Sequence, residues 1–162
     1  MSIPILCFVG RSNSGKTTLI ERLIPELVQG GYRVATIKHA GHGFDLDTEG
    51  KDSWRHKDAG AETVIIASPG KIAMVKNDYQ ESLDSLQKFF GDLDLVITEG
   101  YKKEDKPKIE VVRAARQTDV LLKNDKHLVA VVSDVELKLD VPVFGLDDVD
   151  RLADFIEKNY LL

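Results

Sequence analysis

The segment FVGRSNSGKTTLIERL, residues 8–23, contains the spacing G-x-x-x-x-G-K-T. Its fixed points are Gly10, Gly15, Lys16 and Thr17. Glycine permits positive φ, so that backbone amides can approach an anion closely. Lysine at this position supplies a positive charge for the β- and γ-phosphates, and the hydroxyl that follows suits Mg²⁺. The segment therefore predicts a Walker A loop that binds the phosphates of a nucleotide.

The context of the loop supports this interpretation over that of a plain glycine-rich turn. A buried strand is predicted before the loop and a helix after it, and the helix N-terminus adds a positive dipole end. The Rossmann spacing G-x-G-x-x-G does not occur there. The residues expected to hold the nucleotide phosphates are Gly10, Arg11, Ser12, Asn13, Ser14, Gly15, Lys16, Thr17 and Thr18.

A magnesium site needs a carboxylate besides the Thr17 hydroxyl, and the segment LVITEG offers Glu99 at the end of a predicted strand. The carboxyl ends of parallel strands share one edge of a sheet, so Glu99 is expected on the same edge as the loop. We therefore predict Thr17 and Glu99 as the Mg²⁺ residues. The alternative is a solvated glutamate at the end of a strand.

The elements that must position these residues alternate between strands and helices, which predicts an α/β fold with a parallel sheet. We expect a P-loop NTPase fold, mostly parallel and with helices on both faces, as a single domain over 1–162. The predicted strands are 3–9, 32–38, 62–68, 71–77, 93–100, 106–113, 127–134 and 142–146, and the predicted helices are 17–29, a short one near 52, 82–90 and 148–162.

Composition narrows the class of protein further. The net charge of −5 is unfavourable for general binding of nucleic acid, which needs a basic surface. The lone cysteine, Cys7, lies in an apolar run and excludes an intrachain disulfide, as is usual in a reducing cytoplasm. Since no signal peptide or membrane-spanning segment is evident, we expect a cytoplasmic protein.

Four further stretches narrow the prediction to a family. Together with GRSNSGKTTL, the stretches IKHAGHGFDLDTEGKDSWRHKDAGA, DLVITEGYK, AVVSDV and FGLDDVDRLADFIEKNY resemble the MobB family of adaptors in molybdopterin-guanine dinucleotide biosynthesis. The resemblance covers nearly the whole chain. It implies a homodimer that binds GTP and Mg²⁺, assists the molybdenum cofactor guanylyltransferase MobA, approaches molybdopterin, and is at most a weak GTPase.

The acidic residues of the loop between 39 and 58 are candidates for catalysis. We expect Asp47 or Asp52 to order the metal or the attacking water, with Lys16 as the charge that stabilises phosphoryl transfer. Alternatively both aspartates are solvated, or Asp52 caps the short helix that follows. The sequence leaves open whether GTP is hydrolysed or delivered.

Polar residues at two other places have more than one interpretation. Asp134 ends a strand, and its carboxylate suits the N1 and N2 donors of guanine, although a helix cap or a plain loop acid fits equally. The second place holds His39, His42 and His56. These histidines are expected to contact phosphate or pterin, to be polar loop residues, or to form a zinc site. The basic residues Lys102, Lys103, Lys108 and Arg113 are expected to line a pterin site or to be solvated.

Two other classes of protein share the phosphate loop. A small-molecule kinase or ligase of the dethiobiotin synthetase type would need a pocket for a phosphoryl acceptor. A metal-insertion GTPase would need a site rich in cysteine and histidine, whereas this chain has one cysteine and four histidines. We therefore expect the adaptor function.

Overall fold

The computed structural model describes residues 3–77, 82–116 and 118–162. The chain forms two compact units, one of Met1–His39 with Gln87–Leu162 and the other of Ala40–Leu86. Each unit is described separately below, and the expectation of a single domain over 1–162 stays a prediction. Within the described ranges, no helix has the length and apolar composition needed to cross a bilayer.

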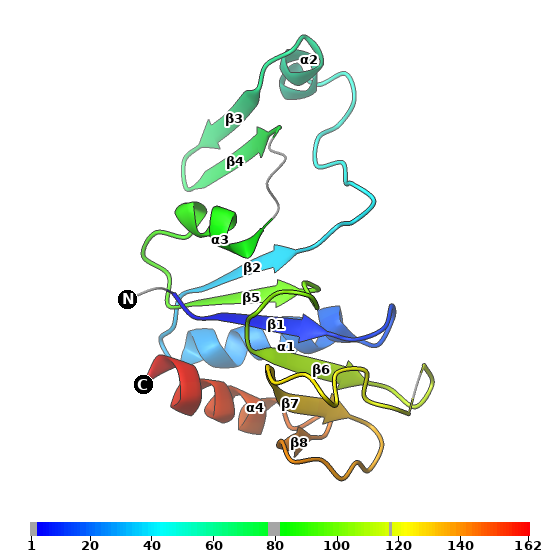
Figure 1. Cartoon of the computed structure of the whole chain (residues 1–162). Helices are drawn as coiled ribbons and strands as arrows, with labels where there is room; N and C mark the ends of the chain where they lie inside the picture. Colours follow the sequence, from blue (N-terminus) through cyan, green and yellow to red (C-terminus); the bar gives the residue numbers. More distant parts are fainter. Residues whose placement is uncertain (1–2, 78–81, 117) are drawn as a thin grey trace. The chain divides into compact units, whose positions relative to one another are not determined.

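The larger unit is built on a six-stranded sheet in the order β2-β5-β1-β6-β7-β8 (Figure 1). All neighbouring strands are parallel, so their carboxyl ends share one edge. The strands are β1 (Ile5–Val9), β2 (Val34–Lys38), β5 (Leu95–Glu99), β6 (Lys108–Val112), β7 (Leu128–Ser133) and β8 (Val143–Phe144). The predicted α/β class with a parallel sheet is confirmed.

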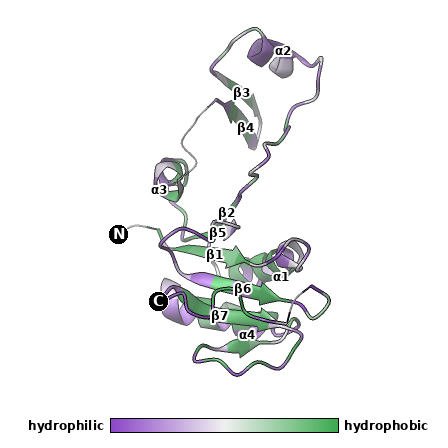
Figure 2. Cartoon of the chain, turned by 45° about the vertical axis from the view of Figure 1, so that its right-hand side comes forward, coloured by the Kyte–Doolittle hydropathy of each residue, from purple (hydrophilic) through white to green (hydrophobic). Residues whose placement is uncertain are grey.

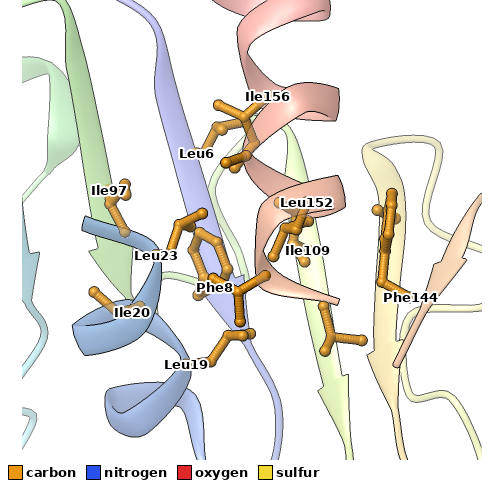
Figure 3. Packing of buried hydrophobic residues seen from close by; sticks show 14 of the residues in the cluster. Leu6, Phe8, Leu19, Ile20, Leu23, Ile97, Ile109, Phe144, Leu152 and Ile156 are labelled. Atoms are coloured by element: carbon orange, nitrogen blue, oxygen red, sulfur yellow. The ribbon is translucent and has the colours of Figure 1, made fainter. Parts of the chain in front are cut away.

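Two helices cover one face of this sheet, α1 (Lys16–Gln29) and α4 (Val149–Ile156), and they contact each other. A π-helical turn, Glu157–Leu161, extends α4. Figure 3 shows the two helices directing leucines and isoleucines toward alternate residues of the strands. The opposite face, near β6 and β7, is covered by side chains from loops.

The predicted apolar face of α1 is largely confirmed, because four of its five expected residues are buried. These are Leu19, Ile20, Leu23 and Leu27. Val28 was expected inward as well, but it is 54% exposed. Its neighbour Leu27 already occupies the buried stripe, and a 100° step around the helix turns Val28 toward solvent.

The register of the strands sets the position of the site. Glu99, the last residue of β5, lies level with Phe8 of β1 on one side and with Lys38 of β2 on the other. Because Gly10 follows Phe8 by only two residues, Glu99 ends close to the start of the phosphate loop. The central strands are coloured as strongly hydrophobic in Figure 2, as expected of strands buried on both faces.

The smaller unit contains α2 (Asp52–Asp58), the hairpin of β3 (Thr63–Ser68) with β4 (Lys71–Lys76), and the short helix α3 (Leu83–Leu86). The antiparallel pairing confirms the predicted hairpin, which forms a sheet of two strands. The start of α2 at Asp52 is also confirmed, although Lys51 rather than Asp52 occupies the N-cap position.

The predicted helix over 82–90 is wrong in its length. Instead, α3 has four residues, and a 3₁₀ turn, Gln87–Phe89, follows it. Leu83 is buried as expected, whereas Phe89 was expected inward and is 47% exposed. The change from α-helical to tighter 3₁₀ winding alters the side on which each later residue falls, so the apolar stripe is not continued.

A candidate phosphate site at the carboxyl edge of the sheet

The phosphate loop connects the end of β1 to the start of α1 with an unusual backbone. Positive φ occurs at Gly10 (144°), Asn13 (58°) and Gly15 (88°), and the Ser14 amide donates to the carbonyl of Arg11 over 3.2 Å. A Cβ atom at Gly10 would lie 2.5 Å from the carbonyl oxygen of Val111 in β6. The loop is therefore pressed against a neighbouring strand, and only glycine fits at its first position.

Ser14 places a polar atom inside this loop. Its side chain is 1% exposed, and among the described residues no group forms a hydrogen bond with its Oγ. A buried hydroxyl that lacks a partner is unfavourable and requires an explanation. An anion held by the loop would accept a hydrogen bond from this hydroxyl, so Ser14 fits a phosphate ligand.

Lys16 folds back over the same loop. Its Nζ donates to the carbonyl oxygens of Gly10, over 3.1 Å, and of Arg11, over 2.8 Å. Burial lowers the pKa of the Lys16 ammonium, Glu99 acts in the opposite direction, and the positive charge of Lys38 lowers it further. An additional negative charge at the loop would offset the cost of burying this ammonium, which is the chemistry expected of a phosphate-binding lysine.

The two residues predicted for magnesium are in direct contact. The Thr17 hydroxyl donates to Glu99 Oε2 over 2.8 Å, from the first turn of α1 to the end of β5. Hydroxyl and carboxylate oxygens are ligands that Mg²⁺ accepts, with phosphates and waters completing its coordination. Among the described residues, no three His, Cys, Asp or Glu side chains gather closely enough to hold a metal ion by themselves.

The chain turns sharply just after Glu99. Gly100 has φ of 107°, and its amide donates to the carbonyl of Phe8 over 2.9 Å. A Cβ at Gly100 would lie 3.1 Å from Cβ of His39, whose ring is 4.9 Å from that of Tyr101. His39 is thereby brought to the same edge as Glu99, next to the residues predicted to hold the metal.

Asp134 also lies at this edge, with both carboxylate oxygens engaged. Oδ1 accepts a hydrogen bond from the Ala114 amide over 2.7 Å, and Oδ2 accepts one from Arg113 Nε over 3.0 Å. The hydrogen bond from the Ala114 amide holds the pKa of Asp134 below its usual range; desolvation opposes it, and the Arg113 guanidinium lowers the pKa as well. This carboxylate is therefore kept ionised, and each oxygen keeps a second lone pair for a ligand.

A hollow of about 470 Å³ opens beside Asp134, between the end of β7 and the β8–α4 connection. It is lined by Ser133, Asp134, Val135, Val143, Phe144, Gly145, Leu146, Asp147 and Asp148. Its volume and its mixture of apolar and acidic lining suit a planar heterocycle that carries hydrogen-bond donors.

Arg113 is a site residue whose place sequence reasoning missed. It was grouped with Lys108 as part of a basic surface, yet the two lie at opposite ends of β6. Lys108 is 2% exposed and pairs with Asp125 over 3.1 Å, so the expectation that it lines a pterin site is wrong. The signal in the sequence is the position of Arg113 at the carboxyl end of a buried strand, which it shares with Glu99 and Asp134.

The predicted residues that follow His39 in the loop between 39 and 58 belong to the smaller unit. Asp47 accepts a hydrogen bond from the Thr48 amide over 2.8 Å, and Asp52 is the exposed first residue of α2. His42 and His56 are exposed. The expected roles of Asp47 and Asp52 in ordering a metal or water stay predictions.

Comparison with known proteins gives a consistent result. The family model described as molybdopterin guanine dinucleotide synthesis protein B matches residues 5–134. The chain is 43% identical to a molybdopterin-guanine dinucleotide biosynthesis adapter protein of Haemophilus influenzae, with 98% of this chain and 90% of the relative covered. The chain is also 41% identical to the molybdopterin-guanine dinucleotide biosynthesis adapter protein of Escherichia coli, with 95% of this chain and 91% of the relative covered.

Solved structures give the same match. A crystal structure of molybdopterin-guanine biosynthesis protein B (mobB) superimposes with a TM-score of 0.77 and 37% identity, covering 95% of this chain and 98% of that one. The crystal structure of Bacillus subtilis MobB also has a TM-score of 0.77, with 27% identity, and the match covers 96% of this chain and 97% of that one.

Proposed function

Because the chain belongs to the molybdopterin guanine dinucleotide synthesis protein B family, we propose that it is a GTP-binding adaptor in molybdopterin-guanine dinucleotide biosynthesis. The observation that supports nucleotide binding best is the hydrogen bond of Thr17 to Glu99 beside the loop that contains Lys16. The same loop holds the buried Ser14 hydroxyl, for which the described part of the chain offers no hydrogen-bond partner. A magnesium ion bound there would neutralise phosphate charge.

The parts of the site have distinct roles in this proposal. The amides and side chains of Gly10 to Thr18 hold the phosphates, and Lys16 balances their charge. Thr17 and Glu99 bind Mg²⁺. The guanine base enters the hollow beside Asp134, whose remaining lone pairs accept from N1 and N2.

The adaptor role extends to partners. The relatives are named adapter proteins, and we propose that this chain, as a homodimer, presents its nucleotide to the guanylyltransferase MobA. Hydrolysis of GTP is then weak, and Asp47 and Asp52 act only when they approach the phosphates. One domain over the whole chain serves both the nucleotide and the partner.

The first experiment measures nucleotide binding by isothermal titration calorimetry with GTP in the presence of Mg²⁺. The wild-type protein is expected to bind GTP more tightly than ATP, and Lys16→Ala is expected to lose about 1.5–3 kcal/mol of binding free energy, the usual worth of a charged hydrogen bond. Omitting Mg²⁺ should weaken binding in the wild type and have much less effect in Glu99→Gln. A wild-type protein that releases no heat with either nucleotide contradicts the proposal.

Base recognition and partnership need separate measurements. Asp134→Asn should shift preference from GTP toward xanthosine triphosphate, since an amide offers a donor where the carboxylate offered an acceptor. Copurification with MobA in the presence of GTP, followed by mass spectrometry of the bound nucleotide, tests the adaptor role. An unchanged GTP preference rejects Asp134 as the base reader, and failure to copurify rejects the partnership.

A further inference from the structure

Arg113 occupies a position that the proposed function does not explain. It follows directly after β6, the strand against which Gly10 is pressed. Its Nη1 lies 3.2 Å from the point where a Cβ atom of Gly15 would be. The guanidinium is therefore beside the last glycine of the phosphate loop, at the N-terminus of α1.

Asp134 determines where this guanidinium lies. It accepts from Nε over 3.0 Å, and it is itself fixed by the Ala114 amide over 2.7 Å. While Nε contacts Asp134, Nη1 of the same guanidinium lies toward Gly15 of the loop. An arginine held in this way loses little further conformational freedom when it binds an anion.

The charge balance of the edge favours an anion at this position. Lys16 and Lys38 are close enough for their charges to interact, and Arg113 adds a third positive charge beside the loop. The carboxylates of Glu99 and Asp134 balance two of these charges, so one net positive charge remains. Arg113 is 39% exposed, so the guanidinium is accessible to a ligand. A planar guanidinium can form two parallel hydrogen bonds with a phosphate, which a lysine cannot.

We propose that Arg113, oriented by Asp134, is a second cationic phosphate-binding residue of this site, acting beside Lys16 on the nucleotide phosphates. This inference rests on the proposed nucleotide binding. A purely structural arginine would only tie the ends of β6 and β7 together and would leave nucleotide affinity unchanged.

The test compares Arg113→Ala and Arg113→Lys with a matched control, Arg33→Ala. Arg33 pairs with Asp94 over 3.6 Å and is exposed, but it precedes β2 and therefore lies at the amino edge of the sheet, away from the phosphate loop. Affinities for GTP and GDP are measured by calorimetry with Mg²⁺ at several salt concentrations, and melting temperatures monitor folding.

Arg113→Ala is expected to weaken both GTP and GDP binding roughly ten- to hundred-fold. It should also reduce the dependence of affinity on salt, because one ionic contact with phosphate is lost. Arg113→Lys should recover part of the affinity, and Arg33→Ala should bind like the wild type. The salt dependence is a property that a merely structural role would not change.

The possible failures are distinguishable. If Arg113→Ala binds both nucleotides as tightly as Arg33→Ala does, while Lys16→Ala binds them more weakly, the inference about Arg113 is overturned and the proposed function stands. If affinity falls but its salt dependence is the same as in the wild type, the residue is structural and the inference is also overturned. If the wild type itself binds no nucleotide, both proposals fall.

Discussion

Replacing Gly10 by alanine tests the geometry of the phosphate loop most directly. The new Cβ would lie 2.5 Å from the carbonyl oxygen of Val111 and 2.9 Å from Ser14 Oγ, with φ at 144°. Such a contact cannot be relieved by a side-chain rotation, because Val111 belongs to a buried strand. The strand or the loop must shift, and either movement displaces the amides that we propose bind phosphate.

The loss of stability expected for Gly10→Ala has two parts. A positive φ at a residue other than glycine costs about 1–2 kcal/mol. Forcing a methyl group into packed surroundings adds about 1–3 kcal/mol. Gly31 provides the matched control, since its φ is 91° and, apart from its two chain neighbours, no described residue has an atom within 4 Å of its Cβ position. Gly31→Ala therefore carries only the first cost.

Equilibrium unfolding in urea compares the two variants. Gly10→Ala is expected to lower the free energy of unfolding by about 2–5 kcal/mol and Gly31→Ala by about 1–2 kcal/mol. Calorimetry with GTP should show weakened binding for Gly10→Ala alone. Equal destabilisation by the two substitutions, or full GTP affinity in Gly10→Ala, would refute the close approach of loop and strand.

Two further predictions concern stability elsewhere in the larger unit. Asp125→Ala removes the partner of Lys108, which is 2% exposed, and should lower the free energy of unfolding in urea by about 3–5 kcal/mol. The control is Asp147→Ala, which removes a side chain that is 94% exposed and should lower it by less than about 1 kcal/mol. Equal losses would contradict the assignment of a buried pair. Tyr32 donates to Glu157 over 2.6 Å, and this hydrogen bond raises the pKa of the phenol. The raised pKa means that its stabilising effect is fully present below the unfolded-state pKa, about 10, and is lost as pH rises through the higher folded-state value. Melting temperatures between pH 8 and about 12 should therefore fall less steeply in Tyr32→Phe than in the wild type, and parallel curves would argue against the contact.

Much of the fold follows from patterns within short segments. The apolar run ILCFV has no polar position, so it predicts a strand buried on both faces, and the glycines and lysine that follow predict the phosphate loop. Because the parallel strands run in one direction, Glu99 lies at the edge of the sheet where α1 begins, with Thr17 in its first turn. The two side chains form a hydrogen bond over 2.8 Å, and their role in binding Mg²⁺ stays a prediction.

Other features could not be predicted because they depend on contacts between distant segments. Lys108 and Arg113 are five positions apart in one basic stretch, and local sequence gives them the same appearance. Only the sheet decides that Lys108 is buried with Asp125 at one end of β6, while Arg113 lies beside Gly15 at the other. Likewise, the sequence around Asp134 does not predict its hydrogen bonds to Arg113 and Ala114, which are 21 and 20 residues away.

The sequence by itself therefore determined a phosphate loop, the two residues predicted for a metal, and the family to which the chain belongs. These depend on residue type and local spacing, which fix backbone conformation over a few residues. The tertiary structure alone decided which charges meet. Ionic and hydrogen-bonding partners are selected by strand order and register, and these are set by burial of the whole apolar core rather than by any single segment.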